Sequence, residues 1–93
     1  PTSFDLMEMV HTLRDMFRER ANSKGLQFDL EIAPTTPQYI TTDAQKLRQT
    51  LLNLLSNAIK FTENGGVTLR VTQMITHQPD GPPSTWLQFF VED

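Results

Sequence analysis

Three polar side chains, Asn53, Asn57 and Lys60, recur at intervals of four and three residues in the segment NLLSNAIKFT. At about 100° per residue, a helix brings these side chains within roughly 60° of one another. The opposite arc of the same helix is aliphatic and consists of Leu47, Leu51, Leu54, Leu55 and Ala58. Asparagine oxygens are hard neutral ligands that suit Mg²⁺, and a lysine one turn further on suits the phosphate oxygens that such a metal bridges. The spacing therefore predicts a helix with a core-forming face and a nucleotide-binding face.

The composition limits the classes of protein to which the chain can belong. Its 93 residues allow one domain at most, and 38% hydrophobic and 20% charged residues with a net charge of −3 are typical of a globular chain. Eight basic residues are scattered among eleven acidic ones without a cluster, which argues against nucleic-acid binding. The lack of cysteine excludes disulfides and thiolate metal sites. No apolar run reaches the roughly 18 residues of a membrane span. A chain that begins at Pro1 is expected to be a piece of a longer protein.

Hydrophobic periodicity divides the first part of the chain into a helix and a strand. Asp5 followed three residues later by Glu8 is typical of a capping box, so a helix is expected from there to about Ser23. Its predicted inner face consists of Leu6, Val10, Leu13, Phe17 and Ala21. Residues 24–25, Lys-Gly, supply a cationic last turn and a glycine that ends the helix. Over residues 26–32 apolar and polar side chains alternate, which indicates a strand with one buried face.

The second part of the chain predicts a short strand at residues 39–40, a long helix and two further strands. Thr42 and Gln45 form another capping-box pattern, so the helix is expected to start there and to end at Phe61 or the next residue. Alternation predicts strands at residues 67–75 and 87–91, joined by a proline-rich loop at 78–84. Because nothing long separates them, the two strands can form an antiparallel hairpin. The economical fold is an α+β two-layer sandwich of helices on a sheet.

Residues 43–71, DAQKLRQTLLNLLSNAIKFTENGGVTLRV, resemble the N-box region of the ATP-binding domain of sensor histidine kinases, most of all the hybrid type. The likeness covers nearly the whole chain, since Phe4-Asp5-Leu6 at the start of a helix and residues 21–26 at its end also follow the family layout. The resemblance implies the Bergerat fold, with helices on a mixed or antiparallel sheet. Residues 1–93 would form the N-terminal half of this ATP-binding (HATPase) domain, ending before the family's glycine-rich boxes.

The resemblance implies a role for each polar position. Asn57 would hold Mg²⁺ against the nucleotide phosphates, and Asn53 would lie beside the phosphates or bind a metal-bound water. Lys60 would contact phosphate oxygens, and Phe61 would lie near the adenine or ribose. Asp93 matches the acid that opens the family's Asp-x-Gly-x-Gly box and accepts a hydrogen bond from adenine N6. The implied cofactors are ATP and Mg²⁺, and no catalytic residue is expected within this piece.

Simpler interpretations stay open for several of these residues. The spacing of Asn53 and Asn57 alone is more typical of a solvated helix face than of a metal site. The residues that follow them occur in the same order as in the family, and this order favours a nucleotide site. Phe61 lies on the border between the two helix faces, so it can equally be a core residue. His11 and His77 lack a second ligand three or four residues away and are expected at the surface.

Asn53 also bears on the implied reaction. In hydrolytic relatives of this superfamily, the residue one turn before the metal-binding asparagine is a glutamate that polarises the attacking water, whereas a carboxamide has no oxygen of useful basicity. The resemblance therefore implies transfer of the γ-phosphoryl group to a histidine on a separate dimerisation domain of a parent kinase, with a response regulator as a further partner. The domain would be cytoplasmic, in a parent that can be membrane-anchored, and this piece alone is expected to be inactive.

A second hypothesis is a non-catalytic interaction module of the same fold that has lost nucleotide binding. Under either hypothesis, uncovered sheet edges and apolar surface predict that the isolated chain oligomerises or exchanges strands.

Overall fold

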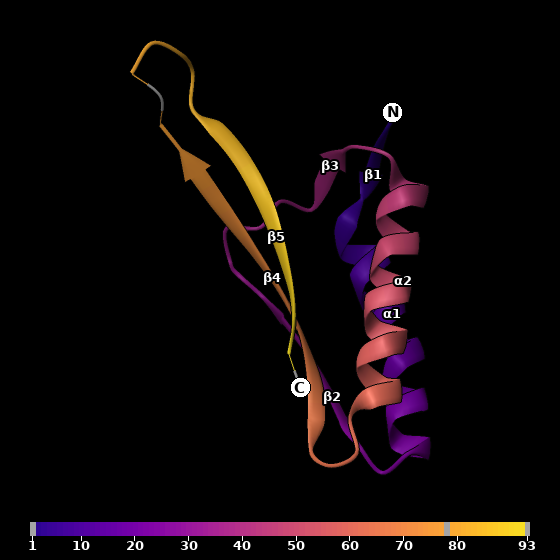
Figure 1. Ribbon diagram of the computed structural model, residues 1–93. Coiled ribbons are helices and arrows are strands. Elements are labelled where there is room, and N and C mark those ends of the chain that lie inside the picture. Colours follow the sequence, from indigo (N-terminus) through magenta and orange to yellow (C-terminus); the bar gives the residue numbers. More distant parts are fainter. Residues whose placement is uncertain (1, 78, 93) are drawn as a thin grey trace.

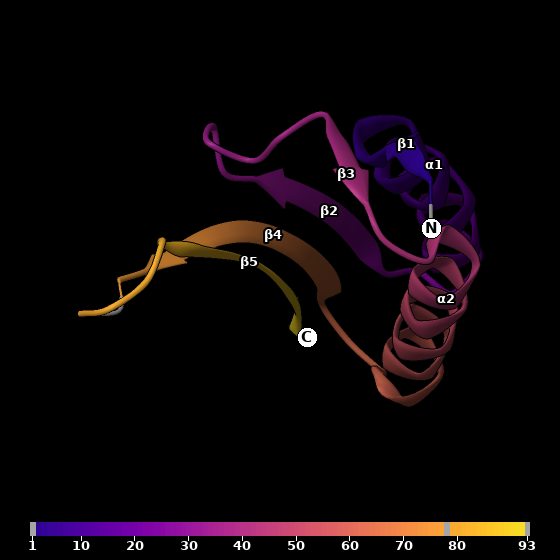
Figure 2. The ribbon, with the colours of Figure 1, turned by 90° about the horizontal axis from the view of Figure 1, so that it is seen from above.

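The computed structural model describes residues 2–77 and 79–92. Along the chain the elements are β1 (Ser3–Asp5), α1 (Leu6–Ser23), β2 (Gln27–Ile32), β3 (Tyr39–Thr41), α2 (Ala44–Phe61), β4 (Gly66–Thr76) and β5 (Ser84–Glu92). In the larger sheet, β4 lies between β2, to which it is parallel, and β5, to which it is antiparallel. α1 and α2 lie on one face of this sheet (Figure 1, Figure 2). The predicted α+β sandwich with a mixed sheet is confirmed.

α1 begins at the predicted cap and buries the predicted face. The Oδ1 atom of Asp5 accepts a hydrogen bond from the backbone N–H of Glu8 at 2.9 Å, which satisfies a donor of the first turn. All five predicted inner residues are buried, namely Leu6, Val10, Leu13, Phe17 and Ala21. Gly25 ends the helix with a φ of +78°, and the N–H of Leu26 donates to the carbonyl of Ala21 at 2.8 Å. The predicted limits of this helix are therefore confirmed.

α2 has its cap one residue later than predicted. The N-cap is Asp43, whose Oδ1 atom accepts a hydrogen bond from the N–H of Lys46 at 3.1 Å. The prediction of Thr42 as the cap, paired with Gln45, is wrong because Asp43 has the extended backbone of a cap and its carboxylate reaches the third helical N–H. The helix ends at Phe61 as predicted.

The buried stripe of α2 is narrower than the sequence predicts. Leu51, Leu55 and Ile59 are buried, whereas Leu54 is 45% exposed. Because Leu54 precedes Leu55 by one residue, it is turned by about 100° around the helix axis, away from the core. The prediction that Leu54 belongs to the core-forming face is wrong. The half-buried apolar residues of α2 that pack against the core are Leu47, Leu52 and Ala58.

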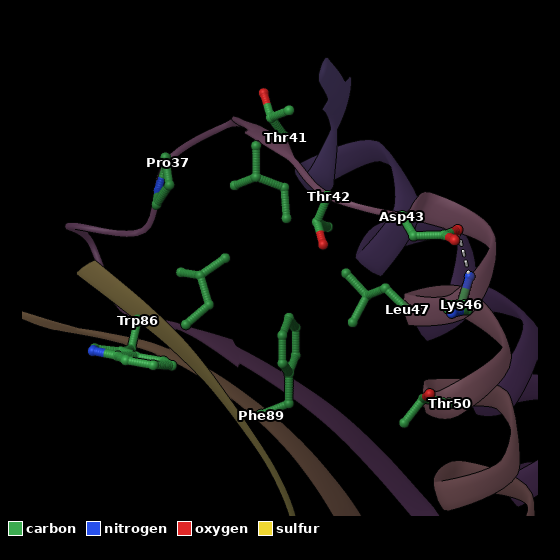
Figure 3. Close-up of a pocket in the computed structure, with 11 residues that line it drawn as sticks. Pro37, Thr41, Thr42, Asp43, Lys46, Leu47, Thr50, Trp86 and Phe89 are labelled. Atoms are coloured by element: carbon green, nitrogen blue, oxygen red, sulfur yellow. Dashed lines mark hydrogen bonds between the residues drawn. The ribbon is translucent and has the colours of Figure 1, made fainter. Parts of the chain in front are cut away.

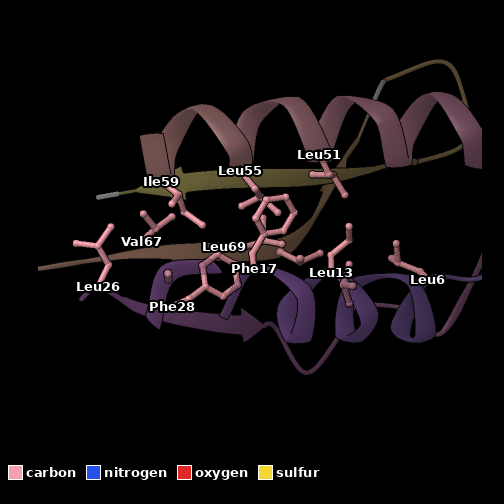
Figure 4. Close-up of a cluster of buried hydrophobic side chains, with 13 residues drawn as sticks. Leu6, Leu13, Phe17, Leu26, Phe28, Leu51, Leu55, Ile59, Val67 and Leu69 are labelled. Atoms are coloured by element: carbon pink, nitrogen blue, oxygen red, sulfur yellow. The ribbon is translucent and has the colours of Figure 1, made fainter. Parts of the chain in front are cut away.

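The hydrophobic core lies between the helices and the sheet. Figure 4 shows side chains of α1 and α2 meeting those of β2 and β4. Phe17 is its largest fully buried side chain, and the ring centroid of Phe17 lies 6.3 Å from that of Phe28. From β4, the inward-pointing residues Val67, Leu69 and Val71 are all buried. The alternation predicted for this strand is therefore confirmed as far as Val71, whereas Ile75, further along the strand, is 53% exposed.

The sequence predicted only one strand of the pair formed by β1 and β3. β3 covers the short strand predicted at residues 39–40, but β1 was not predicted because three residues are too few to show alternation. Phe4 pairs with Ile40, and the N–H of Leu6 donates to the carbonyl of Gln38 at 2.7 Å. The start of α1 is thereby tied to the segment that leads into α2.

Arg70 links the three strands of the larger sheet on the face away from the helices. Its Nε atom donates to Glu31 Oε2 at 2.8 Å, and its Nη1 atom donates to Glu92 Oε1 at 2.7 Å. The hydrogen bond to Glu31, followed by the charge of Glu92, raises the pKa of the guanidinium above its ordinary value. All three side chains are more than a third exposed, so water screens these ion pairs. The three side chains thus bridge β2, β4 and β5 across that face of the sheet.

Candidate functional site

The polar face of α2 is open to solvent. Asn53, Asn57 and Lys60 are all exposed, so the predicted division between an inner and an outer side of this helix holds at these positions. The Oδ1 atom of Asn53 accepts a hydrogen bond from Gln49 Nε2 at 3.1 Å, which connects it to the preceding turn of the same face. The structure thus leaves these carboxamides and this ammonium accessible to a ligand.

Phe61 lies at the end of the same helix and is 71% exposed. The alternative of a core position for Phe61 is therefore wrong. The Nζ atom of Lys60 lies 5.4 Å from the centroid of the Phe61 ring, a distance at which a cation is attracted to an aromatic face. An ammonium and an exposed ring beside each other at the end of the polar face can contact a charged and an aromatic part of one ligand.

Lys24 fixes the end of α2 that carries these residues. Its Nζ atom donates to the carbonyl oxygens of Ile59 at 2.7 Å and of Lys60 at 2.8 Å. The last carbonyls of a helix lack partners within the helix and carry partial negative charge, so a lysine ammonium stabilises them. Periodicity does not reveal this contact, because the two residues are far apart in the sequence.

Replacing Lys24 with methionine is expected to lower the free energy of unfolding by about 1 kcal/mol and to loosen the last turn of α2. Urea unfolding followed by circular dichroism measures the first effect. Hydrogen exchange at the N–H of Thr62, which donates to the carbonyl of Ala58 at 3.1 Å, measures the second. Lys46→Met is the matched control, because a cation in the first turn of α2 opposes the helix dipole and its loss should not destabilise. Equal destabilisation by both changes would exclude a capping role.

Asp93, the expected adenine-binding acid, lies outside the described residues. The strand before it can still be placed: Glu92 pairs with Thr68, near the start of β4, and β4 follows α2 after a short turn. β5 therefore ends beside the first part of β4, the strand that follows the end of α2 (Figure 1).

An apolar groove that the sequence did not predict lies at the other end of α2. It has a volume of about 550 Å³ and runs between the first turns of α2 and β5. Figure 3 shows Leu47 and Thr50 facing it from the helix and Phe89 facing it from the sheet. None of Asn53, Asn57, Lys60 or Phe61 lines it. The only sequence signals for this groove were the apolar residues Leu47, Leu87 and Phe89, which are equally compatible with a hydrophobic core.

Other types of site find no support in the part of the chain that the structure describes. Over residues 2–77 and 79–92, no group of three His, Asp or Glu side chains lies close enough to hold a metal ion. His11 and His77 are exposed, as predicted. Neither α1 nor α2 has the length and hydrophobicity that a membrane span requires.

Comparison with known proteins gives relatives of one type. The sensory/regulatory protein RpfC of Xanthomonas campestris pv. campestris is 38% identical over 90 residues, which is 97% of this chain and 12% of that protein. The aerobic respiration control sensor protein ArcB of Escherichia coli strain K12 is 43% identical over 67 residues, 72% of this chain and 9% of ArcB. The hybrid signal transduction histidine kinase D of Dictyostelium discoideum is 33% identical over 78 residues, 84% of this chain and 5% of that kinase. The chain thus spans about an eighth or less of these relatives. No family model matches it.

A solved structure shares the fold. The crystal structure of the histidine kinase ThkA in complex with the response regulator protein TrrA matches 92% of this chain and 25% of the ThkA chain, with a TM-score of 0.64 and 24% sequence identity. At this identity the match concerns the fold alone, and it agrees with the helix-on-sheet arrangement described above.

Proposed function

Since the chain belongs to the sensor histidine kinases, we propose that residues 1–93 form the first half of the ATP-binding (HATPase) domain of a parent kinase. The observation that carries this proposal is the exposed face of α2, which presents Asn57 and Lys60 to solvent within a segment homologous to these kinases. A solvated helix face can carry polar residues of this kind, so it is the homology of the surrounding segment that favours a ligand-binding role for them.

In the proposed site, Asn57 supplies the protein oxygen to Mg²⁺. This ion takes six oxygens, retains several waters and needs only one or two ligands from protein, so one carboxamide together with the triphosphate forms a sufficient inner shell. Asn53 lies one turn away and binds the phosphates or a metal-bound water. Lys60 neutralises phosphate charge, and Phe61 covers the adenine or ribose. Asp93 accepts the adenine N6 hydrogen bond.

The proposed reaction is phosphoryl transfer. Asn53 occupies the position from which a carboxylate would activate water, and its amide cannot act as a general base. The site would therefore hold ATP against hydrolysis until a histidine nitrogen on a separate dimerisation domain attacks the γ-phosphorus, the bond from the γ-phosphorus to the β,γ-bridging oxygen breaks, and ADP leaves. Lys60 would neutralise charge on the phosphate oxygens, and a bound Mg²⁺, held by Asn57, would supply further charge neutralisation. The parent would be a protein-histidine kinase whose ATP-binding domain is cytoplasmic, and the 93-residue chain alone would be inactive. That ThkA was solved with a response regulator supports a partner of this kind for the parent.

The test is a chimera in which this chain replaces the matching 90 residues of RpfC. We expect the chimera to bind Mg·ATP and to phosphorylate its histidine, and Asn57→Ala to weaken nucleotide binding at least about tenfold, since even second-layer residues of metal sites cost 10–100-fold when lost. Binding is measured with a fluorescent ATP analogue in the presence and absence of Mg²⁺. The variant should lose most of the Mg²⁺-dependent part of the affinity.

Asn22→Ala is the matched control, because it removes the same carboxamide from an exposed position of α1 that faces no proposed ligand. If Asn22→Ala and Asn57→Ala bind Mg·ATP equally well, the metal role of Asn57 is wrong. If the chimera folds but binds no nucleotide, the non-catalytic interaction module becomes the better hypothesis.

A further inference from the structure

We propose that the hydroxyl of Thr62 hydrogen-bonds the adenine base of the nucleotide. This inference rests on the proposed function and adds to it a residue that recognises the base. Thr62 is the C-cap of α2 and directly follows Phe61. Among the described residues it is the only polar residue that is buried, with 4% of its surface exposed.

The Thr62 side chain places a hydrogen-bonding group in an apolar layer. Ile59, one turn earlier, and Val67, the first buried residue of β4, both belong to the hydrophobic core. Within the described structure the Thr62 Oγ1 atom is shielded from solvent and has no hydrogen-bond partner, whereas the backbone N–H of Thr62 donates to the carbonyl of Ala58. A buried hydroxyl without a partner costs free energy, and most such groups in proteins are hydrogen-bonded. Since valine would fill the same space without this cost, packing does not explain a threonine here.

Around α2, exposure falls step by step from the polar face to Thr62. At about 100° per residue, each member of the following series lies about 40–60° further around the helix than the one before it. The series is Lys60, Asn57, Phe61, Ala58 and Thr62. Its first three members are exposed, Ala58 is half-buried and Thr62 is buried. The helix surface thus changes from charged to apolar and ends at a single hydroxyl.

This series lies on the side of α2 that faces β5. Leu47 and Thr50 fall in the same angular range, and they face the groove opposite Phe89 (Figure 3). Side chains of a helix lean toward its N-terminus, so the Thr62 side chain leans toward the turn that contains Ala58. Because Ala58 carries only a methyl group, little side-chain bulk separates the Thr62 hydroxyl from a flat group that lies over Ala58.

The order of these groups matches the order of the parts of a nucleotide. In the proposed site Asn57 and Lys60 hold Mg²⁺ and the phosphates, which are charged and keep bound water. The adenine base is neutral and aromatic, and its ring nitrogens accept hydrogen bonds, so it can enter an apolar layer where a donor meets them. A hydroxyl is such a donor, and it costs far less to bury than an ammonium does. Thr62 therefore suits the base and not the phosphates.

Thr62→Val in the RpfC chimera tests the inference, because it removes the hydroxyl and keeps the shape of the side chain. Thr62 has a φ of −91° and a ψ of 122°, a backbone conformation that valine adopts readily. We expect the variant to bind Mg·ATP about two- to tenfold more weakly, the usual contribution of one neutral hydrogen bond. Binding of Mg·tripolyphosphate, which lacks the base, should not change. Thr62→Ser, which keeps the hydroxyl, should bind Mg·ATP like the unchanged chimera.

The stability of the ligand-free 93-residue chain should change in the opposite direction. Because the hydroxyl has no partner in the described structure, Thr62→Val should raise the midpoint of urea unfolding. Thr36→Val is the matched control, since the Thr36 Oγ1 atom is also buried without a partner there but lies in the loop before β3. It should raise the urea midpoint of the chain and leave Mg·ATP binding by the chimera unchanged.

The possible failures can be told apart. A chimera that binds no Mg·ATP would overturn the proposed function and this inference together. Unchanged Mg·ATP binding by Thr62→Val, or an equal loss of affinity for Mg·ATP and Mg·tripolyphosphate, would overturn this inference alone. A lower urea midpoint for Thr62→Val would also overturn it, because the hydroxyl would then have its partner within the protein.

Discussion

Phe17→Ala is expected to lower the free energy of unfolding by about 3–5 kcal/mol, a large share of the roughly 5–15 kcal/mol that stabilises a typical domain. The Phe17 side chain is fully buried, and its ring meets Phe28 with centroids 6.3 Å apart. The guanidinium carbon of Arg20 also lies 4.9 Å from the centroid of the Phe17 ring, so the substitution removes a cation–π contact as well as apolar burial. Because the ring joins the inner face of α1 to β2, the cavity left by alanine cannot close without moving one of them. Urea unfolding followed by far-ultraviolet circular dichroism measures the loss.

Phe61→Ala is the control for this experiment, since the same atoms are removed from a ring that is 71% exposed. Its effect on unfolding should stay within about 0.5 kcal/mol. Similar losses of unfolding free energy in the two variants would mean that the Phe61 ring is buried in solution. That result would contradict the core described here and the exposed position of Phe61 in the proposed site.

The sequence predicted best those elements that bury one regularly spaced apolar face against one large packing partner. All of the predicted inner residues of α1 are buried, because its stripe repeats without interruption and both helix ends carry local signals. The cap of α2 was misplaced because Thr42 and Asp43 are both good caps and sit side by side. Local sequence cannot choose between them, whereas the backbone of the structure does, through the bond from Lys46 to Asp43.

The features that the sequence did not predict depend on contacts between distant residues. β1 forms where Phe4 pairs with Ile40, and no local sequence pattern predicts this pairing. The residue type of Leu54 suggests a core position. Its exposure depends on how far α1 and the sheet extend around α2, which the local sequence does not show. The polar side of the candidate site was predictable because Asn53, Asn57 and Lys60 lie on one helix. The contact of Lys24 with the end of that helix was not, because the helix and the lysine meet only in the folded chain.

Gly66→Val tests whether strand propensity or a tertiary contact decides the stability at the start of β4. Valine is favoured in strands by its shape, and Gly66 is the first residue of β4, so propensity alone predicts stabilisation. A Cβ atom at this position would lie 2.7 Å from the carbonyl oxygen of Gln27 and 3.0 Å from its Cβ, closer than real contacts allow. The obstacle is backbone of the adjacent parallel strand, which cannot turn aside as a side chain can. We therefore expect a loss of about 1–3 kcal/mol in the free energy of unfolding.

Thr68→Val is the matched control for Gly66→Val, because it places the same side chain two residues further along β4, on the same face, where a side chain already fits. It should be neutral or stabilising in the same urea titration. If Gly66→Val proved as stable as Thr68→Val, the close approach of β2 and β4 at the end of the sheet beside the candidate site would be wrong. That result would also remove the physical reason for a glycine at position 66. Gly65 has a φ of +90°, which favours glycine, but Gly66 has no positive φ.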